Sequence, residues 1–279
     1  MSPRLDKEMV SRGLATSRTR AAQQISAGEV QVDGRSGVKA STAVTAAAHI
    51  TVSAQDQWVS RAAHKLLGAL ELFPSVDPAG MRCLDAGAST GGFTQVLLAQ
   101  GAKHVTAADV GHDQLAPQLR EHPRVSSCEG TNLRYVKPGD LGEPFGLIVA
   151  DLSFISLRLV LSPLAGLAAE GAALLIMVKP QFEVGRVLLP RTGVVTDPAQ
   201  RRAAVESVIG AAADAGLTTV GIARSPLAGQ DGNAEFFLCL WKKTAGVSAA
   251  DDRLFGAELD SADLDTVDFS DRQSPKEVR

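Results

Sequence analysis

Aromatic residues are scarce in this chain, at 4% of the sequence with two tryptophans and one tyrosine, so a base-stacking surface built on many rings is not expected. Long apolar runs are also lacking. The longest, Ala172 to Val178, is too short to span a membrane and is typical of a buried strand. The N-terminus has no apolar core followed by small residues, and we therefore expect no signal peptide and no membrane partner.

Cysteine is rare as well. Cys83, Cys128 and Cys239 are far apart, each within a predicted strand, and lack the paired spacing of a metal site. They are expected to be reduced core residues of a cytoplasmic protein, and no metal cofactor is predicted.

The formal net charge of -3 is unevenly distributed. From Ala249 onward nine acids face four bases, so this tail carries -5 and the rest of the chain +2. Few large apolar residues occur in the tail, which predicts disorder over residues 246–279.

Residues 1–55 form a predicted separate module. Apolar positions indicate two short helices, the second capped by Ser17 and ended by Gly28, followed by short strands around the Asp33-Gly34 turn. Several cations gather on this small unit: Arg4, Arg12, Arg18, Arg20 and Lys39. A linker at 56–59 leads to a second domain at 60–245.

Strands and helices alternate along the second domain, which predicts an α/β fold with a mostly parallel, seven-stranded, Rossmann-like sheet covered on both faces. Strands are expected at 81–86, 104–109, 125–128, 146–150, 172–178, 218–224 and 235–242. One helix is expected from Ser60 to about Leu72, and others near Gly91, Gln114, Leu157 and Asp197.

A nucleotide-type pocket is indicated where the first of these strands ends. The sequence Leu84-Asp85-Ala86-Gly87-Ala88-Ser89-Thr90-Gly91-Gly92-Phe93-Thr94 is a strand, a turn of small residues and a helix start, and Asp109 follows the next strand. An acid at that distance accepts hydrogen bonds from ribose hydroxyls. Ser89 stands where a dinucleotide fingerprint has its second glycine, so the loop favours S-adenosylmethionine, which has no phosphate to hold.

Four charged side chains are predicted to meet at the carboxyl edge of the sheet. Asp151 and Lys179 each follow an apolar strand. Glu235 reaches the same edge if the last strand is antiparallel, and Lys65 lies in the early turns of a helix that starts there.

These residues resemble the Lys-Asp-Lys-Glu tetrad of ribose 2'-O-methyltransferases with an FtsJ-like fold. The motifs Arg61-x-x-His64-Lys65-Leu66, Asp151-Leu152-Ser153-Phe154-Ile155-Ser156 and Val178-Lys179-Pro180-Gln181-Phe182-Glu183 add to the likeness. Residues 1–55 resemble an S4 RNA-binding domain through Arg4-Leu5-Asp6, Arg12-Gly13-Leu14, Ser17-Arg18 and the stretch from Ile25 to Gly34. Together, residues 1 to about 243 resemble the TlyA family of ribosomal RNA methyltransferases, some of which carry a hemolysin name.

The resemblance implies methylation of a ribose 2'-hydroxyl, that of a cytidine, in 16S rRNA, 23S rRNA or both. A hydroxyl is a poor nucleophile while protonated, and an amine can accept its proton where burial and a second ammonium favour the neutral amine. Our hypothesis makes Lys179 the base or a proton relay, Lys65 the neighbouring ammonium that also positions the hydroxyl, and Asp151 and Glu235 the carboxylates that orient the lysines.

The resemblance also implies residues that bind S-adenosylmethionine, and these are Asp85, Gly87, Ser89, Thr90, Gly91, Gly92, Phe93, Asp109 and Asn132. From the residues alone, Asp85 could instead hold the turn and Asn132 could cap the next segment. For contact with rRNA, in a ribosomal subunit or the ribosome, the expected residues are Arg4, Arg18, Lys39, Arg61 and Arg186. Two positions depart from related sequences: Asp56 stands where arginine is expected, and Gly130 where a basic residue is common.

Other functions fit the sequence less well. An exocyclic-amine methyltransferase would end the fourth strand with Asn/Asp-Pro-Pro-aromatic, and a base-carbon enzyme would use a Pro-Cys pair, but this chain has neither. S4 modules also accompany pseudouridine synthases, which need no cofactor loop. A membrane-active hemolysin and a non-catalytic assembly factor remain as alternatives of other classes. The sequence leaves the modified nucleotide and the oligomeric state open.

Overall fold

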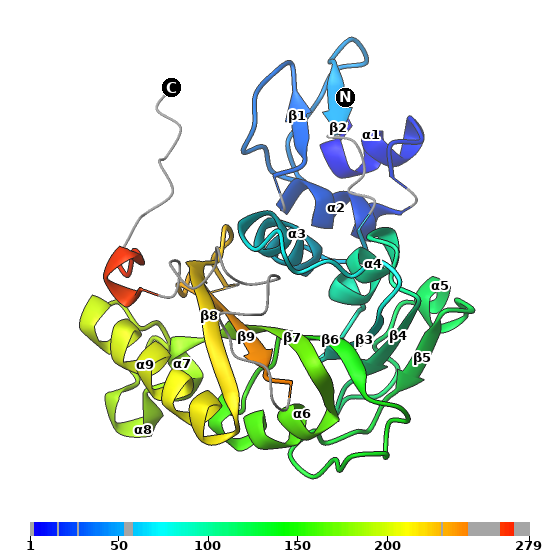
Figure 1. The fold of residues 1–279 in the computed structure, drawn as a ribbon. Coiled ribbons are helices and arrows are strands. Elements are labelled where there is room, and N and C mark those ends of the chain that lie inside the picture. The colour runs from blue at the N-terminus through cyan, green and yellow to red at the C-terminus, as the bar shows by residue number, and fades with distance from the viewer. Residues whose placement is uncertain are drawn as a thin grey trace. The chain divides into compact units, whose positions relative to one another are not determined.

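The computed structural model describes residues 3–15, 17–26, 28–52, 58–229, 231–244 and 263–270. The chain divides into two compact units, Met1–Gln57 and Trp58–Arg279, which are called here the N-terminal and C-terminal units. Figure 1 shows the elements of each. Asp56 and the rest of the predicted linker up to Gln57 lie outside the described residues.

The N-terminal unit is a small α+β fold. Its helices are α1 (Leu5–Ser11) and α2 (Arg18–Ser26), and its strands β1 (Val30–Val32) and β2 (Ile50–Val52) pair antiparallel. Leu5, Met9 and Ile25 from the helices pack with Val30 and Ile50 from the strands, which gives the unit a core of its own.

The C-terminal unit contains the predicted seven-stranded sheet, in the order β5-β4-β3-β6-β7-β9-β8. All neighbouring strands are parallel except at β9, which runs antiparallel to both its neighbours. This confirms the predicted fold class. The strands are β3 (Arg82–Ala86), β4 (His104–Ala108), β5 (Val125–Cys128), β6 (Phe145–Ala150), β7 (Ala168–Val178), β8 (Leu217–Arg224) and β9 (Phe236–Lys242).

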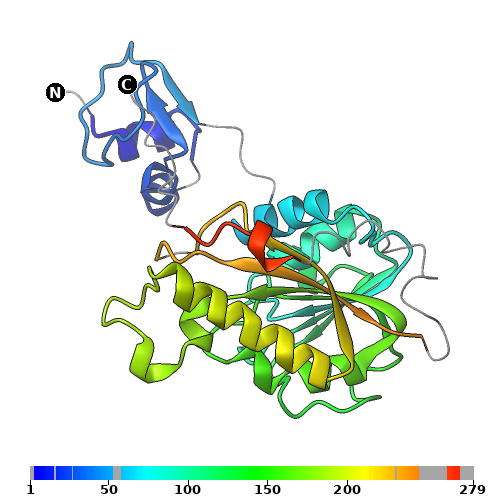
Figure 2. The same ribbon diagram turned by 60° about the vertical axis from the view of Figure 1, so that its left-hand side comes forward.

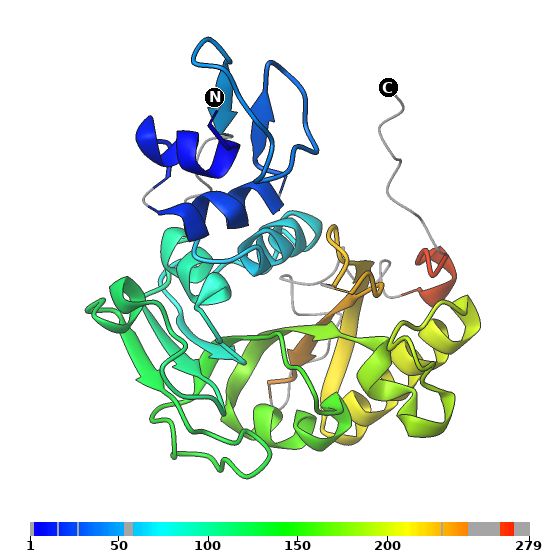
Figure 3. The same cartoon turned by 180° about the vertical axis from the view of Figure 1, so that it is seen from behind.

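Helices cover both faces of this sheet (Figures 1 and 3). On one face lie α3 (Ala62–Leu72) and α4 (Gly92–Ala99), and on the other lie α6 (Leu161–Leu167) and α9 (Pro198–Asp214). The shorter helices are α5 (Pro117–Arg120), the 3-10 turn η1 (Leu157–Leu159), α7 (Pro180–Glu183) and α8 (Gly185–Leu188). Successive residues of a strand point to opposite faces, so on β9 Phe236 packs on the α6 and α9 side and Phe237 on the α3 side.

The predicted disorder of the tail does not hold for residues 263–270. This C-terminal segment contains a 3-10 turn, η3 (Leu264–Thr266), and buries Phe269 to 8% exposure against the C-terminal unit. Figure 2 shows the segment in red beside the strands β8 and β9. The acidic composition of the tail did not predict this packing, because the contacts are made by one aromatic side chain and by backbone carbonyl groups. Residues 245–262 and 271–279 lie outside the described part of the chain.

Candidate active site

The ends of β6 and β7 place the first lysine and carboxylate together. Ala150 on β6 pairs with Ile176 on β7, so the residues that follow each strand leave the sheet at the same edge. Lys179 Nζ lies 2.6 Å from Asp151 Oδ1, and it also donates a hydrogen bond of 2.8 Å to Ser153 Oγ. Both side chains of the ion pair are largely buried, with 10% and 15% exposed.

A second ion pair joins α3 to the start of β9. Lys65 Nζ donates to Glu235 Oε2 at 2.6 Å, and the Glu235 side chain is 3% exposed. Burial raises the pKa of Glu235, whereas Lys65 and then Lys179 oppose that rise. Asp151 raises it further. The structure thus brings the four predicted side chains into one electrostatic cluster, and protonation of any one affects the others.

Gly87 fixes how closely β3 approaches the Asp151 segment. Its φ is 88°, a conformation that suits glycine, and a Cβ there would lie 2.8 Å from the Asp151 carbonyl oxygen. The backbone after β3 can therefore pass directly beside the backbone after β6.

A cavity of about 530 Å³ opens beside this contact. Of the predicted residues, it is lined by Gly87, Ser89, Asp109, Asn132 and Asp151. Its walls also include apolar side chains, among them Val110, Leu133 and Ile155. The volume and the mixture of apolar walls with a few polar groups are typical of a small-molecule site.

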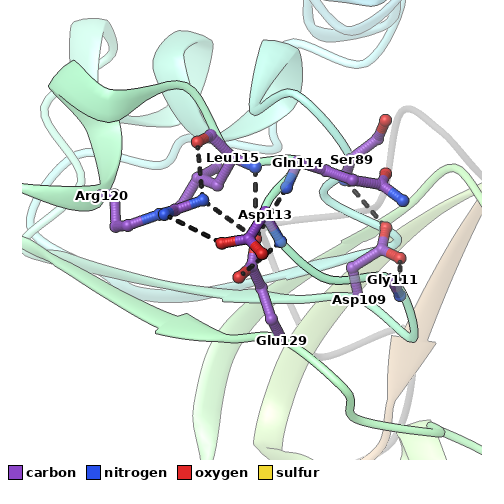
Figure 4. Close-up of polar contacts among 8 residues, drawn as sticks. All are labelled: Ser89, Asp109, Gly111, Asp113, Gln114, Leu115, Arg120 and Glu129. Atoms are coloured by element: carbon purple, nitrogen blue, oxygen red, sulfur yellow. Dashed lines mark hydrogen bonds and ion pairs between the residues drawn. The ribbon is translucent and has the colours of Figure 1, made fainter.

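Asp109 connects the two loops of this cavity, as Figure 4 shows. Its Oδ2 accepts a hydrogen bond from Ser89 N at 2.9 Å and its Oδ1 accepts one from Gly111 N at 2.8 Å. The carboxylate is held in place by these two bonds, and its remaining lone pairs can accept hydroxyl donors.

Sequence reasoning missed Glu129, which organises the next loop (Figure 4). Its carboxylate accepts hydrogen bonds from three consecutive backbone N–H groups, at Asp113, Gln114 and Leu115. These bonds lower the pKa of Glu129. Since Gln114 lines the cavity, Glu129 shapes that wall. The only sign of Glu129 in the sequence was its position directly after a short predicted strand. Acidic residues are common at such positions, so this position alone did not indicate a role.

Three residues predicted to bind the cofactor have partners within the protein. Asp85 is fully buried and accepts a 2.6 Å hydrogen bond from Thr94 Oγ1, and burial raises its pKa to about 7. Asp85 therefore holds the turn. Phe93 stacks on Phe237, with ring centroids 6.5 Å apart. Asn132 lines the cavity, but its Oδ1 accepts from Arg134 N as a local cap.

The other loop residues are also absent from the described cavity lining, which leaves out Thr90, Gly91 and Gly92. A Cβ at Gly92 would lie 2.3 Å from Ser60 Oγ and 3.1 Å from Ala63 N. Gly92 thus lets α4 pack closely against the start of α3, the helix that carries Lys65.

Glu183, at the end of α7, was quoted within a motif without a role. Its Oε2 accepts from Ser156 Oγ at 2.6 Å, and its Oε1 accepts from Leu157 N at 2.7 Å. Phe154 lies between these contacts and Asp151, is 92% exposed and has a φ of 63°. Glu183 therefore anchors the far end of the loop that begins at Asp151.

The predicted RNA-contacting arginines of the N-terminal unit share one buried acid. Arg4 Nε lies 3.1 Å from Asp6 Oδ1, and Arg18 Nη2 lies 2.9 Å from Asp6 Oδ2. Hydrogen bonds from Arg4 and Arg18 lower the pKa of Asp6 to about 2. The two arginine side chains remain 54% and 60% exposed. They are oriented by the protein and still open to solvent.

The other side chains predicted to contact RNA are open to solvent. Lys39, Arg61 and Arg186 are all exposed. Arg12 differs, because its guanidinium donates to the Ala48 and Thr45 carbonyls and pairs with Glu8. Gly130 has a φ of 71°, and a Cβ there would lie 2.6 Å from the His112 ring. A basic side chain at position 130 would be strained in this conformation.

Within the described ranges, no helix is long and apolar enough to cross a membrane. The same residues include no group of three or more histidine, cysteine, aspartate or glutamate side chains arranged to hold a metal ion.

Comparisons with known proteins identify the family of each of the two units. Residues 58–242 match the FtsJ-like methyltransferase family, and residues 3–48 match the S4 domain. The chain is 52% identical over 243 residues to the 16S/23S rRNA (cytidine-2'-O)-methyltransferase TlyA of Mycobacterium tuberculosis, covering 86% of this chain and 90% of that relative. The chain belongs to the TlyA family.

Two proteins with a hemolysin name are also similar to this chain. Hemolysin A of Brachyspira hyodysenteriae is 35% identical, with 84% of this chain and 97% of the relative covered. A solved structure from Streptococcus thermophilus with a hemolysin name is 33% identical and superimposes with a TM-score of 0.69, covering 93% of this chain and 95% of that one.

Proposed function

We propose that the protein methylates a ribose 2'-hydroxyl, that of a cytidine, in ribosomal RNA and takes the methyl group from S-adenosylmethionine. The observation that carries this proposal is the electrostatic cluster formed by the Lys179–Asp151 and Lys65–Glu235 ion pairs, in which Asp151 also lines the cavity. Within the family, the TlyA of Mycobacterium tuberculosis is named for this reaction on 16S and 23S rRNA.

The residues around the cavity fit S-adenosylmethionine. Asp109 lies in the wall with both oxygens fixed by backbone N–H groups, so it presents acceptors to the ribose hydroxyls of the cofactor. Val110, Leu133 and Ile155 line the cavity as well and would offer apolar surface to its adenine. When bound, the cofactor supplies a methyl group that its sulfonium already activates.

The protein's own contribution is to prepare the nucleophile. Lys179 Nζ would accept the proton of the 2'-hydroxyl as the oxygen takes up the methyl group, and the C–S bond of the cofactor would break to release S-adenosylhomocysteine. Asp151 and Ser153 hold the Lys179 side chain in place before the reaction. Lys65, held by its ion pair with Glu235, would donate a hydrogen bond that orients the hydroxyl. Alignment of the reacting atoms supplies much of the remaining rate.

The N-terminal unit supports RNA as the methyl acceptor. Arg4 and Arg18 are exposed guanidinium groups held by Asp6, a geometry suited to phosphate oxygens. We assign binding of folded rRNA to the surface formed by Arg4, Arg18 and Lys39. The proposed substrates are ribosomal subunits or ribosomes in the cytoplasm.

The test is transfer of radiolabelled methyl groups from S-adenosylmethionine to ribosomal subunits. Lys179→Ala is expected to lower the rate by about 100- to 10,000-fold, the range typical of a lost general base, while cofactor binding stays near normal. Lys103→Ala is the matched control, because Lys103 is exposed just before β4, at the opposite edge of the sheet. Full activity of Lys179→Ala would contradict the assigned base. Mass spectrometry of rRNA from cells with and without the gene then identifies the nucleotide.

A further inference from the structure

The C-terminal segment 263–270 lies outside the residues that match the methyltransferase family, yet it contacts the part of the sheet that carries Glu235. The ring of Phe269 packs against that of Phe236, with centroids 4.9 Å apart. Phe236 is fully buried and directly follows Glu235 in the chain. The segment therefore touches the first residue of β9.

Alternation along β9 shows what this contact supports. Phe236 points into the core on the α6 and α9 side of the sheet, and Phe269 belongs to the same cluster. Glu235, the residue before it, reaches Lys65 of α3, which covers the opposite face. Phe269 thus supports the start of β9 from the face opposite the catalytic ion pair.

Hydrogen bonds lead from the segment to the same site by a second route. Arg201 of α9 is 1% exposed, and its guanidinium donates to the Phe269 carbonyl at 3.0 Å and the Val195 carbonyl at 2.8 Å. Val195 N donates in turn to Asn233 Oδ1 at 2.9 Å. Asn233 is buried two residues before Glu235. A shift of Phe269 would remove an acceptor from a buried cation and disturb this series of bonds.

Arg224, at the end of β8, provides a third contact. Its guanidinium donates to the carbonyl oxygens of Ser270 at 2.6 Å and Asp268 at 3.3 Å. Arg224 also stands opposite Phe236 in the sheet. All three routes converge on the beginning of β9.

We infer that the C-terminal segment is a positioning element for Glu235, with Phe269 as its central residue. The inference rests on the proposed function, in which Glu235 holds Lys65. Disturbing the segment is therefore expected to lower turnover and to change cofactor binding little, because neither Glu235 nor any residue of the segment is part of the described cavity lining.

Phe269→Ala in the full chain is the central test. We expect its turnover number for methyl transfer to fall by about 10- to 100-fold, as displaced catalytic groups typically cause. The dissociation constant for S-adenosylhomocysteine, measured by calorimetry, is expected to stay within about twofold, because the cavity is untouched. Phe269→Leu keeps most of the apolar volume and is expected to recover most of the turnover.

Two further variants complete the design. Arg224→Gln loosens the segment without opening the core, and a severalfold loss of turnover is expected from it even if Phe269→Ala does not fold. Asp265→Asn breaks only the exposed ion pair of Asp265 with Arg202, which lies at 2.6 Å, and is expected to leave turnover unchanged.

Hydrogen exchange separates failure of this inference from failure of the proposed function. In Phe269→Ala, faster exchange at residues 233–237 is expected whether or not the wild-type protein methylates rRNA. Unchanged exchange there, wild-type turnover in a folded Phe269→Ala variant, or an equal loss of cofactor affinity and turnover would each overturn the inference. Absence of methyl transfer by the wild-type protein would instead refute the proposed function.

Discussion

Replacing Gly87 by alanine tests whether the close approach of two loops sets the geometry of the site. Two costs are expected. A φ of 88° is unfavourable for alanine by about 1–2 kcal/mol, and forcing a methyl group into packed surroundings costs about 1–3 kcal/mol more. The second cost arises here because the new Cβ would lie 2.8 Å from the Asp151 carbonyl oxygen and 3.0 Å from the Leu152 side chain.

Gly80→Ala is the matched control, because Gly80 has a φ of 72° and no described atom lies within 4 Å of a Cβ built there. It carries the conformational cost alone. Gly87→Ala is therefore expected to unfold at a lower temperature than Gly80→Ala, by about 2–4 °C for each additional kcal/mol. It is also expected to lose at least about tenfold in methyl transfer, since the Asp151 backbone must move. Thermal unfolding and radiolabel transfer check both. Equal unfolding temperatures and equal activities of the two variants would refute the reasoning.

Three further predictions concern the cofactor wall and the RNA-binding face. Asp109→Ala is expected to weaken S-adenosylmethionine binding much more than RNA binding, as measured by calorimetry and filter binding, and equal losses would count against the cavity. The pKa of Glu129 is lowered in the folded protein, so its stabilising effect is complete above the ordinary value of 4.5 and is lost as the pH falls through the lowered pKa. Glu129→Gln is thus expected to weaken cofactor binding at pH 7 and to reduce the loss of binding seen on acidification, which titration calorimetry across that range would detect. Arg18→Ala is expected to reduce RNA affinity and the salt dependence of binding without changing the fold, whereas Arg12→Ala is expected to lower the unfolding temperature of the N-terminal unit; the reverse pattern would contradict the assignment.

The sequence predicted that the tetrad meets at one edge of the sheet because it shows where apolar runs lie and where charged residues end them. A continuous apolar run ending in Lys179 indicates a buried parallel strand, and the carboxyl ends of such strands share an edge. Glu235 required one added assumption, an antiparallel last strand, which β9 fulfils. Lys65 followed from the direction of a helix that precedes the first strand.

Close packing and backbone acceptors could not be predicted in the same way. The sequence does not distinguish a glycine that lies against a ligand from one that lies against a neighbouring helix. Gly92 was predicted to bind the cofactor, and the structure shows that it borders Ser60. Glu129 and Glu183 bind backbone N–H groups on distant segments, and such partners have no side-chain signal. Phe269 lies in an acidic stretch whose composition predicts disorder, and its order depends on contacts with residues far away in the chain.

The Lys179–Glu183 segment explains how an irregular loop can hold Asp151, the carboxylate that we propose orients Lys179. Lys179 contacts the loop at Asp151 and Ser153, and Glu183 contacts it at Ser156 and Leu157. Both ends of the loop are thus fixed by one short segment that continues directly from strand β7, which lies between β6 and β9 in the sheet. Because the base and the anchor belong to one segment, a movement of β7 shifts Lys179 and the Asp151 loop together and preserves the distance between them. The Lys65–Glu235 pair has no such common segment, since α3 and β9 are far apart in the chain, and its geometry depends on packing from both faces of the sheet. Of the two lysines proposed to be catalytic, Lys179 is therefore fixed by a neighbouring segment and Lys65 by tertiary packing, and Lys65 is expected to be the more sensitive to changes at a distance.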